Sequence, residues 1–79
     1  MEIEIVSPDK RLFKGKANLV QVPGKNGSFE VLKNHAPIVS ALSKGSVKVG
    51  ISGNDFEYFD IKGGVIEVNN NKIIVLVET

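Results

Sequence analysis

The chain has 79 residues, of which 42% are hydrophobic and 24% charged, with a formal net charge of +1 at pH 7 and no cysteine. A chain of this length forms a single domain, residues 1–79. The lack of cysteine excludes a disulfide framework and a thiolate zinc site. The balanced charge gives no general attraction to nucleic acid, and no apolar stretch approaches the ~20 residues that cross a bilayer, so no direct membrane insertion is expected.

Apolar and polar side chains alternate with a period of two from the start of the chain, which predicts β-strands. Ile3 and Ile5 share one face of a first strand that ends at Ser7-Pro8. The acidic residues Glu2 and Glu4 alternate with them, which is unlike a secretion or transit peptide, so we expect the chain on the cytoplasmic side. A short second strand at Leu12-Phe13 is expected to close at Lys14-Gly15.

The next segment is divided by turn residues. A third strand over residues 19–22 is expected to stop at Pro23-Gly24, because proline fixes φ and glycine accepts positive φ. A strand over residues 28–32 follows the hairpin dipeptide Asn26-Gly27. Residues 36–43 fit one face of a helix about as well as a bent strand, and a run this short argues against the helix.

After Lys44-Gly45 the alternation returns in two strands that are joined by a turn at residues 52–55. The first strand is expected to place three β-branched residues on one face, namely Val47, Val49 and Ile51. The second is expected to place large apolar residues on both faces, with Phe56 and Tyr58 on one side and Phe59 and Ile61 on the other.

The last third begins at Gly63-Gly64, which predicts a bulge or a corner. Residues 65–68 are expected to pair with residues 73–77 across a turn at 69–71. The final strand is apolar on both sides, and such a strand is normally covered on both faces, inside a sandwich or beneath a partner. About nine to ten short, mostly antiparallel strands predict an all-β fold, a flattened β-sandwich or barrel.

The titratable residues form no catalytic or metal-binding pattern. His35 is the only histidine, and its neighbours supply no carboxylate or thiolate, so a turn histidine bonded to backbone is expected. The carboxylates are scattered singly among apolar residues, as on the solvated faces of strands. Residues 24–28 lack the order of a phosphate loop. We therefore expect no catalytic residue, no cofactor and no metal.

The basic cluster Lys10 to Lys16 leaves a second interpretation open, a small β-barrel that binds nucleic acid and stacks a base on Phe13. The balanced overall charge favours an edge strand on which lysines prevent edge-to-edge pairing. A carrier domain with a modified lysine is a third interpretation. Lys25 and Lys44 lie in predicted turns, but they lack the acidic neighbours that such a lysine needs.

Several stretches occur in an order and spacing that resembles one family. They are Val6-Ser7-Pro8, Leu12 to Ala17, Val20 to Gly24, Gly27 to Leu32, Asn34 to Leu42, Lys44 to Val49, Gly63 to Val68 and Ile73 to Glu78. Together they are similar to the amino-terminal β-sandwich domain of the epsilon subunit of F-type ATP synthase, which is called delta in mitochondria. The resemblance covers essentially the whole chain. Its most specific part is His35-Ala36-Pro37, followed at the right distance by Gly63-Gly64.

The resemblance implies a ten-stranded flattened sandwich at the foot of the central stalk, a rotor subunit that is not an enzyme by itself. Such a domain binds the gamma subunit and rests on the c-ring, so that ion-driven rotation is coupled to ATP synthesis. The resemblance also implies a peripheral location at the cytoplasmic face of the cell membrane, where the complex holds the domain, and no nucleic-acid partner.

Family positions that match this sequence give two predicted contact sets. The c-ring contact is expected at four residues, Lys25, Asn26, Ser28 and Glu30, with Glu30 as the charged partner. The gamma contact is expected at four others, Ser7, His35, Ser40 and Lys62.

The sequence departs from the family pattern at two places. The family usually continues into a helical hairpin that inhibits ATP hydrolysis, whereas this sequence ends at Thr79, so a short or truncated form is expected. The family also tends to place an acidic residue directly after the glycine at position 27. Here Ser28 occupies that position, and the acidic group is Glu30, the next residue on the same face of the strand.

Overall fold

The computed structural model describes all residues from Met1 to Thr79 and consists of nine β-strands without a helix. There is therefore no helix long and apolar enough to cross a membrane. The all-β prediction is confirmed. The strands are β1 (Glu2–Val6), β2 (Arg11–Lys16), β3 (Leu19–Gly24), β4 (Gly27–Leu32), β5 (Ile38–Leu42), β6 (Gly45–Ser52), β7 (Asp55–Ile61), β8 (Gly63–Asn69) and β9 (Lys72–Glu78).

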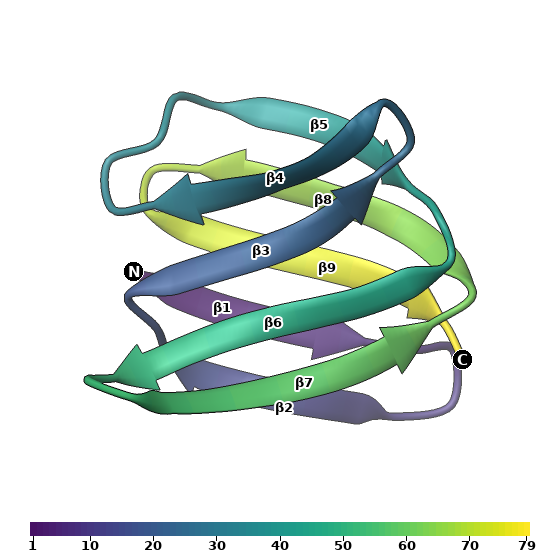
Figure 1. Cartoon of the computed structure of the whole chain (residues 1–79), viewed down its shortest axis with the longest axis horizontal. Helices are drawn as coiled ribbons and strands as arrows, with labels where there is room; N and C mark the ends of the chain where they lie inside the picture. Colours follow the sequence, from purple (N-terminus) through teal and green to yellow (C-terminus); the bar gives the residue numbers. More distant parts are fainter.

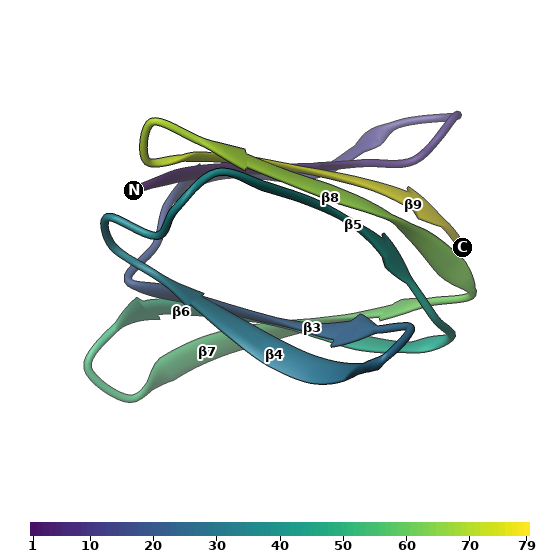
Figure 2. The ribbon, with the colours of Figure 1, turned by 90° about the horizontal axis from the view of Figure 1, so that it is seen from above.

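The strands form one strongly curled sheet that folds into two layers (Figures 1 and 2). The first layer has the order β2-β1-β9-β8-β5, and the second has the order β4-β3-β6-β7. The layers are joined where β5 meets β3 at a single residue pair, Leu42 and Gly24. We call these layers the first and second sheet. All strand pairs are antiparallel except β1 with β9. These are the first and last strands of the chain, and they lie side by side in parallel.

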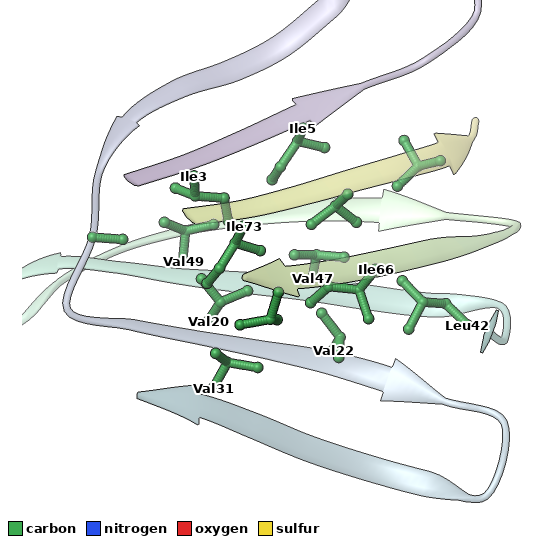
Figure 3. Close-up of a cluster of buried hydrophobic side chains, with 14 of the residues drawn as sticks. Ile3, Ile5, Val20, Val22, Val31, Leu42, Val47, Val49, Ile66 and Ile73 are labelled. Atoms are coloured by element: carbon green, nitrogen blue, oxygen red, sulfur yellow. The ribbon is translucent and has the colours of Figure 1, made fainter. Parts of the chain in front are cut away.

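The core lies between the two sheets and is almost entirely aliphatic (Figure 3). Its fifteen buried hydrophobic residues alternate with outward-facing ones, as a strand period of two requires. Ile73, Val75 and Val77 supply three of them from β9 alone. At about 25 cal/mol per Å² of buried apolar surface, this layer is the main stabilising term of the fold. The free edges β2 and β7 approach each other through an edge-to-face contact between Phe13 and Phe59, whose ring centroids are 5.9 Å apart.

Two predicted strand ends were wrong, because both strands run further. The second strand continues through Lys14-Gly15 to Lys16, paired along its length with β1. The third includes Pro23 and Gly24, which pair with Ser28 and Gly27 of β4. Proline is tolerated there because β6 pairs with β3 only from Leu19 to Gln21, so the missing N–H interrupts no ladder on that side.

The ambiguous run at residues 36–43 contains the strand β5, so the helical alternative is excluded. Leu42 faces the core, whereas Val39 and Ala41 face outward and are exposed. The predicted corner at Gly63-Gly64 is confirmed, since the chain passes there from β7 in the second sheet to β8 in the first.

Two local predictions were wrong. The β3–β4 turn is formed by Lys25 and Asn26 between the paired residues Gly24 and Gly27, and Gly27 alone of these has positive φ, 124°. The expected turn dipeptide was shifted by one residue. Ile51 does not share the buried face of Val47 and Val49, because the β6–β7 register shifts between Gly50 and Ser52, and Ile51 is exposed.

Candidate protein-binding surfaces

The outer face of the first sheet carries an apolar patch. Cross-strand neighbours place Ala41, Val65, Leu76 and Val6 in one continuous row across β5, β8, β9 and β1. In the next row Val39 and Ile74 are separated by the exposed Glu67, and Glu4 follows Ile74. We call these residues the outer apolar patch: Val6, Val39, Ala41, Val65, Ile74 and Leu76.

The outer apolar patch is uncovered within this chain. Val39 is 68% exposed, Leu76 54% and Val65 40%. The sequence predicted that β9, which is apolar on both faces, lies inside a sandwich or beneath a partner. Only its inner face is covered by the chain itself. A contiguous apolar surface of this kind is typical of a protein–protein contact.

The basic cluster lies at the other end of the same sheet, on the edge strand β2. Its positive charges lie opposite glutamates of the neighbouring strand β1. Lys14 is the register partner of Glu4, Lys16 is the partner of Glu2, and Arg11 Nε donates to Glu4 Oε2 at 3.0 Å. The positive side chains therefore belong to a mixed-charge surface, which fits an edge strand protected by charge better than a continuous path for a phosphate backbone.

The structure brings the four predicted c-ring residues together on the β3–β4 hairpin. Lys25 and Asn26 form its tip, and Ser28 and Glu30 point outward from β4 on the same face; all four are exposed. Ser28 Oγ accepts a hydrogen bond from Gln21 Nε2 at 3.3 Å. The backbone N–H of Lys25 donates to the carbonyl oxygen of Ala41 at 3.1 Å, which ties the hairpin to β5. An open hollow of about 600 Å³ lies between the hairpin and β5.

The four predicted gamma residues are dispersed, but all border the first sheet. Ser7 follows β1, and the backbone N–H of Lys62 donates to the carbonyl oxygen of Glu78 at 2.7 Å, so both lie near the end of β9. His35 lies in the loop at the opposite end, and Ser40 lies on β5. Their assignment to gamma stays a prediction.

Burial distinguishes these four residues from one another. Ser7 is only 5% exposed, and its hydroxyl donates to the carbonyl oxygen of Lys10 at 3.1 Å and accepts from the backbone N–H of Lys10 at 3.3 Å. It therefore fixes the β1–β2 turn. His35 Nδ1 lies 2.6 Å from the carbonyl oxygen of Ala36, which is the backbone-bonded turn histidine expected from the sequence. Lys62 is exposed, and Ser40 is half-buried.

A second cluster of exposed apolar side chains lies on the outer face of the second sheet. Leu32 is 54% exposed, Tyr58 63% and Phe56 37%, and Lys48 Nζ lies 4.3 Å from the centroid of the Phe56 ring. The lysine covers part of the aromatic surface with its aliphatic stem and a cation–π contact. Charged residues also border the outer apolar patch, at Glu67 and Glu4, so both outer faces combine apolar and charged side chains.

Sequence reasoning missed most of the outer apolar patch. The signal was present in β9, where apolar residues occupy both phases of the strand, but Val6, Val39 and Val65 each look like an ordinary strand residue. Only the cross-strand register, which joins segments far apart in the chain, shows that they form one surface with Leu76.

The fold contains no enclosed cleft in which reactive groups converge. No group of three or more His, Cys, Asp or Glu side chains is placed to hold a metal ion. The prominent features are instead an exposed apolar face and an exposed polar hairpin. The fold and its surfaces thus define the class of the protein, a small β-sandwich with an exposed apolar face and an exposed polar hairpin.

Comparison with known proteins gives the family. A family profile described as "ATP synthase, Delta/Epsilon chain, beta-sandwich domain" matches residues 1–79. The chain is 46% identical over 76 residues to the ATP synthase epsilon chain of Chlorobaculum tepidum, covering 96% of this chain and 86% of that one. It is 40% identical over 77 residues to the epsilon chain of Chlorobium limicola, covering 98% and 88%.

The chain therefore belongs to the ATP synthase delta/epsilon chain family and is a non-catalytic subunit domain. Among solved structures, a chain of the mitochondrial ATP synthase of Euglena gracilis, determined with OSCP, F1 and the c-ring, has the same fold. Its TM-score is 0.90 at 20% identity. The match covers 98% of this chain but 49% of that one, so this chain spans about half the length of its structural relative.

Proposed function

We propose that the chain is a central-stalk subunit of an F-type ATP synthase, and that it couples ion-driven rotation to ATP synthesis by binding gamma and the c-ring at separate surfaces. The observation that carries this proposal is the family match over residues 1–79, together with an apolar sheet face that the chain leaves uncovered. Within the complex the domain sits peripherally at the cytoplasmic face of the membrane.

Gamma binds the outer apolar patch. Leu76 and Val65 are direct cross-strand neighbours near its centre, and both are large enough to anchor a contact when a partner excludes water from them. Of the four predicted gamma residues, Lys62 is exposed and its N–H bonds to Glu78 at the end of β9. Ser40 is in phase with the buried Ile66 of β8 and Ser7 is itself buried, so these two do not bear on the choice of face.

The c-ring binds the β3–β4 hairpin. This hairpin projects at one end of the sandwich beside the end of β5 (Figure 1), where the Lys25 N–H bonds to the carbonyl oxygen of Ala41 at the border of the outer apolar patch. Its exposed surface is polar, with Lys25 and Glu30 as the charged groups, which fits a contact with hydrophilic loops rather than with lipid. A partner on the hairpin and a partner on the sheet face would not compete for the same residues, so torque can pass from one to the other through the rigid core.

Co-isolation tests this proposal. An affinity-tagged chain is expressed in the cells from which it comes, the membranes are solubilised in mild detergent, and bound proteins are identified by mass spectrometry. We expect the gamma and c subunits of the ATP synthase to be recovered with it. Recovery of neither subunit would overturn the proposal.

A further inference from the structure

The tip of the β3–β4 hairpin carries the only Asn-Gly sequence of the chain, Asn26-Gly27. An asparagine side chain loses ammonia spontaneously when the backbone nitrogen of the following residue attacks its amide carbon, and glycine offers the least steric hindrance to that attack. We propose that Asn26-Gly27 is a site of spontaneous covalent modification, at which Asn26 converts to aspartate and isoaspartate.

The local geometry leaves this pair accessible. Asn26 and Gly27 are both exposed. A Cβ atom built on Gly27 would meet no heavy atom within 4 Å, so the side-chain face of this residue is open to solvent. The Asn26 side chain takes part in none of the side-chain hydrogen bonds of the structure, so its amide is free to rotate toward the backbone nitrogen.

Asn26 is distinguished from the other asparagines by the glycine that follows it. Asn69 and Asn70 are also exposed and without a side-chain hydrogen bond, but each is followed by an asparagine, whose side chain hinders the attack. The amides of Asn34 and Asn71 are bonded to each other, and the Asn18 amide donates to the carbonyl oxygen of Ile51 at 3.2 Å. Asn54 lies in an exposed turn as Asn26 does, but it is followed by Asp55, whose side chain hinders the attack. The chemistry should therefore select Asn26.

The reaction needs only water. The Gly27 nitrogen gives up its proton and bonds to Asn26 Cγ, the Cγ–Nδ2 bond breaks, and ammonia leaves, which produces a cyclic succinimide. Water then opens the ring at one of its two carbonyl carbons. Opening at the side-chain carbonyl gives aspartate. Opening at the backbone carbonyl gives isoaspartate, in which the main chain runs through the former side chain.

Either product changes the hairpin. Aspartate adds a carboxylate beside Lys25. Isoaspartate adds a methylene to the main chain inside a two-residue turn, which is incompatible with the present pairing of Gly24 and Gly27 and strains the bond from Lys25 to the Ala41 carbonyl. An effect of this change on the c-ring contact rests on the proposed function, whereas the conversion itself does not.

The test is peptide mapping of the purified chain after prolonged incubation at mildly alkaline pH and physiological temperature. Wild type is compared with Asn26→Gln, whose longer side chain cyclises much more slowly. We expect the Asn26 peptide of wild type to gain the mass of –OH for –NH₂, several-fold faster than any other asparagine peptide. An isoaspartyl methyltransferase should then label it, and the variant should show no conversion at this position.

Conversion that is absent at Asn26, or faster at Asn54 or any other asparagine, would overturn the proposal. Because the readout is a covalent change in the isolated chain, it is independent of ring binding. A chain that converts but binds no c-ring would refute the proposed function alone, and a chain that binds the ring without converting would refute the modification site alone.

Discussion

Hydrogen bonds between Asn34 and Asn71 hold together two loops that are far apart in the chain. The backbone N–H of Asn34 donates to Asn71 Oδ1 at 2.6 Å, and Asn71 Nδ2 donates to Asn34 Oδ1 at 2.9 Å. Both residues have positive φ, 65° and 60°. The Asn71 carbonyl oxygen also accepts from the N–H of Glu2 at 2.9 Å, so this turn holds both the His35 loop and the start of β1.

Asn71→Ala should lower the free energy of unfolding by ~2–3 kcal/mol, because it loses two hydrogen bonds and forces alanine into the left-handed region. Asn70→Ala is the matched control. Asn70 also has positive φ, 51°, but its side chain makes no hydrogen bond. The control should lose only ~1 kcal/mol. Urea titration measures both, and equal losses would show that the amide pair contributes nothing.

Gly64→Ala should be severely destabilising, by more than ~3 kcal/mol, or should prevent folding. A Cβ atom at Gly64 would overlap the carbonyl oxygen of Leu76, and the neighbouring strand cannot move without breaking the β8–β9 ladder. Gly53→Ala is the control. Gly53 has positive φ, 51°, with open space around it, so alanine should cost only ~1 kcal/mol there.

Thermal denaturation of the two glycine variants ranks them directly. If Gly64→Ala melts as high as Gly53→Ala, the close approach of β9 at this position is wrong.

Glu30→Lys should weaken the coupling of ATP synthesis to ion flow without unfolding the domain. Glu30 is exposed on the outward side of β4, so the substitution changes a contact and leaves the core unaltered. Glu57→Lys on β7 makes the same charge change at an exposed position remote from the hairpin, and it should leave coupling unchanged. ATP synthesis in inverted membrane vesicles, with circular dichroism of the isolated variants, measures both effects. Normal coupling in Glu30→Lys would count against the ring contact at this residue.

The strand pattern was predictable from the sequence because each strand has an inner and an outer face. The alternation at Ile3 and Ile5 and along residues 73–77 is a local signal that burial enforces. Strand ends were less predictable. Pro23 can remain in β3 because the neighbouring strand β6 does not pair with β3 at that position, so no ladder hydrogen bond needs the missing N–H. That depends on the assembled sheet and not on the local sequence.

The proposed contact surfaces were predictable only in part. The hairpin residues are close in sequence, so the family resemblance could assign them as a group, and their contact with the c-ring stays a prediction. The outer apolar patch joins β1, β5, β8 and β9, and it arises from the parallel pairing of the first and last strands. No short-range pattern encodes that pairing. The hydrogen bonds between Asn34 and Asn71 also join distant segments, so the sequence did not indicate them.

The chain should show no salt-dependent affinity for single-stranded nucleic acid. Lys14 and Lys16 of β2 lie opposite Glu4 and Glu2 of β1. Phe13 is the only aromatic residue of this cluster, and it is half-buried against Phe59. Fluorescence titration of labelled oligonucleotides at several salt concentrations measures this. Tight binding that falls steeply with salt would instead support the nucleic-acid interpretation.

The affinity of the purified domain for purified gamma tests whether gamma docks on the outer apolar patch. Leu76→Glu is compared with Leu32→Glu, since both leucines are 54% exposed but lie on opposite faces of the sandwich. A buried anchor contributes ~2 kcal/mol or more, so Leu76→Glu should weaken binding at least ~30-fold while Leu32→Glu binds like wild type. Equal affinities, or a loss confined to Leu32→Glu, would show that gamma does not bind the outer apolar patch.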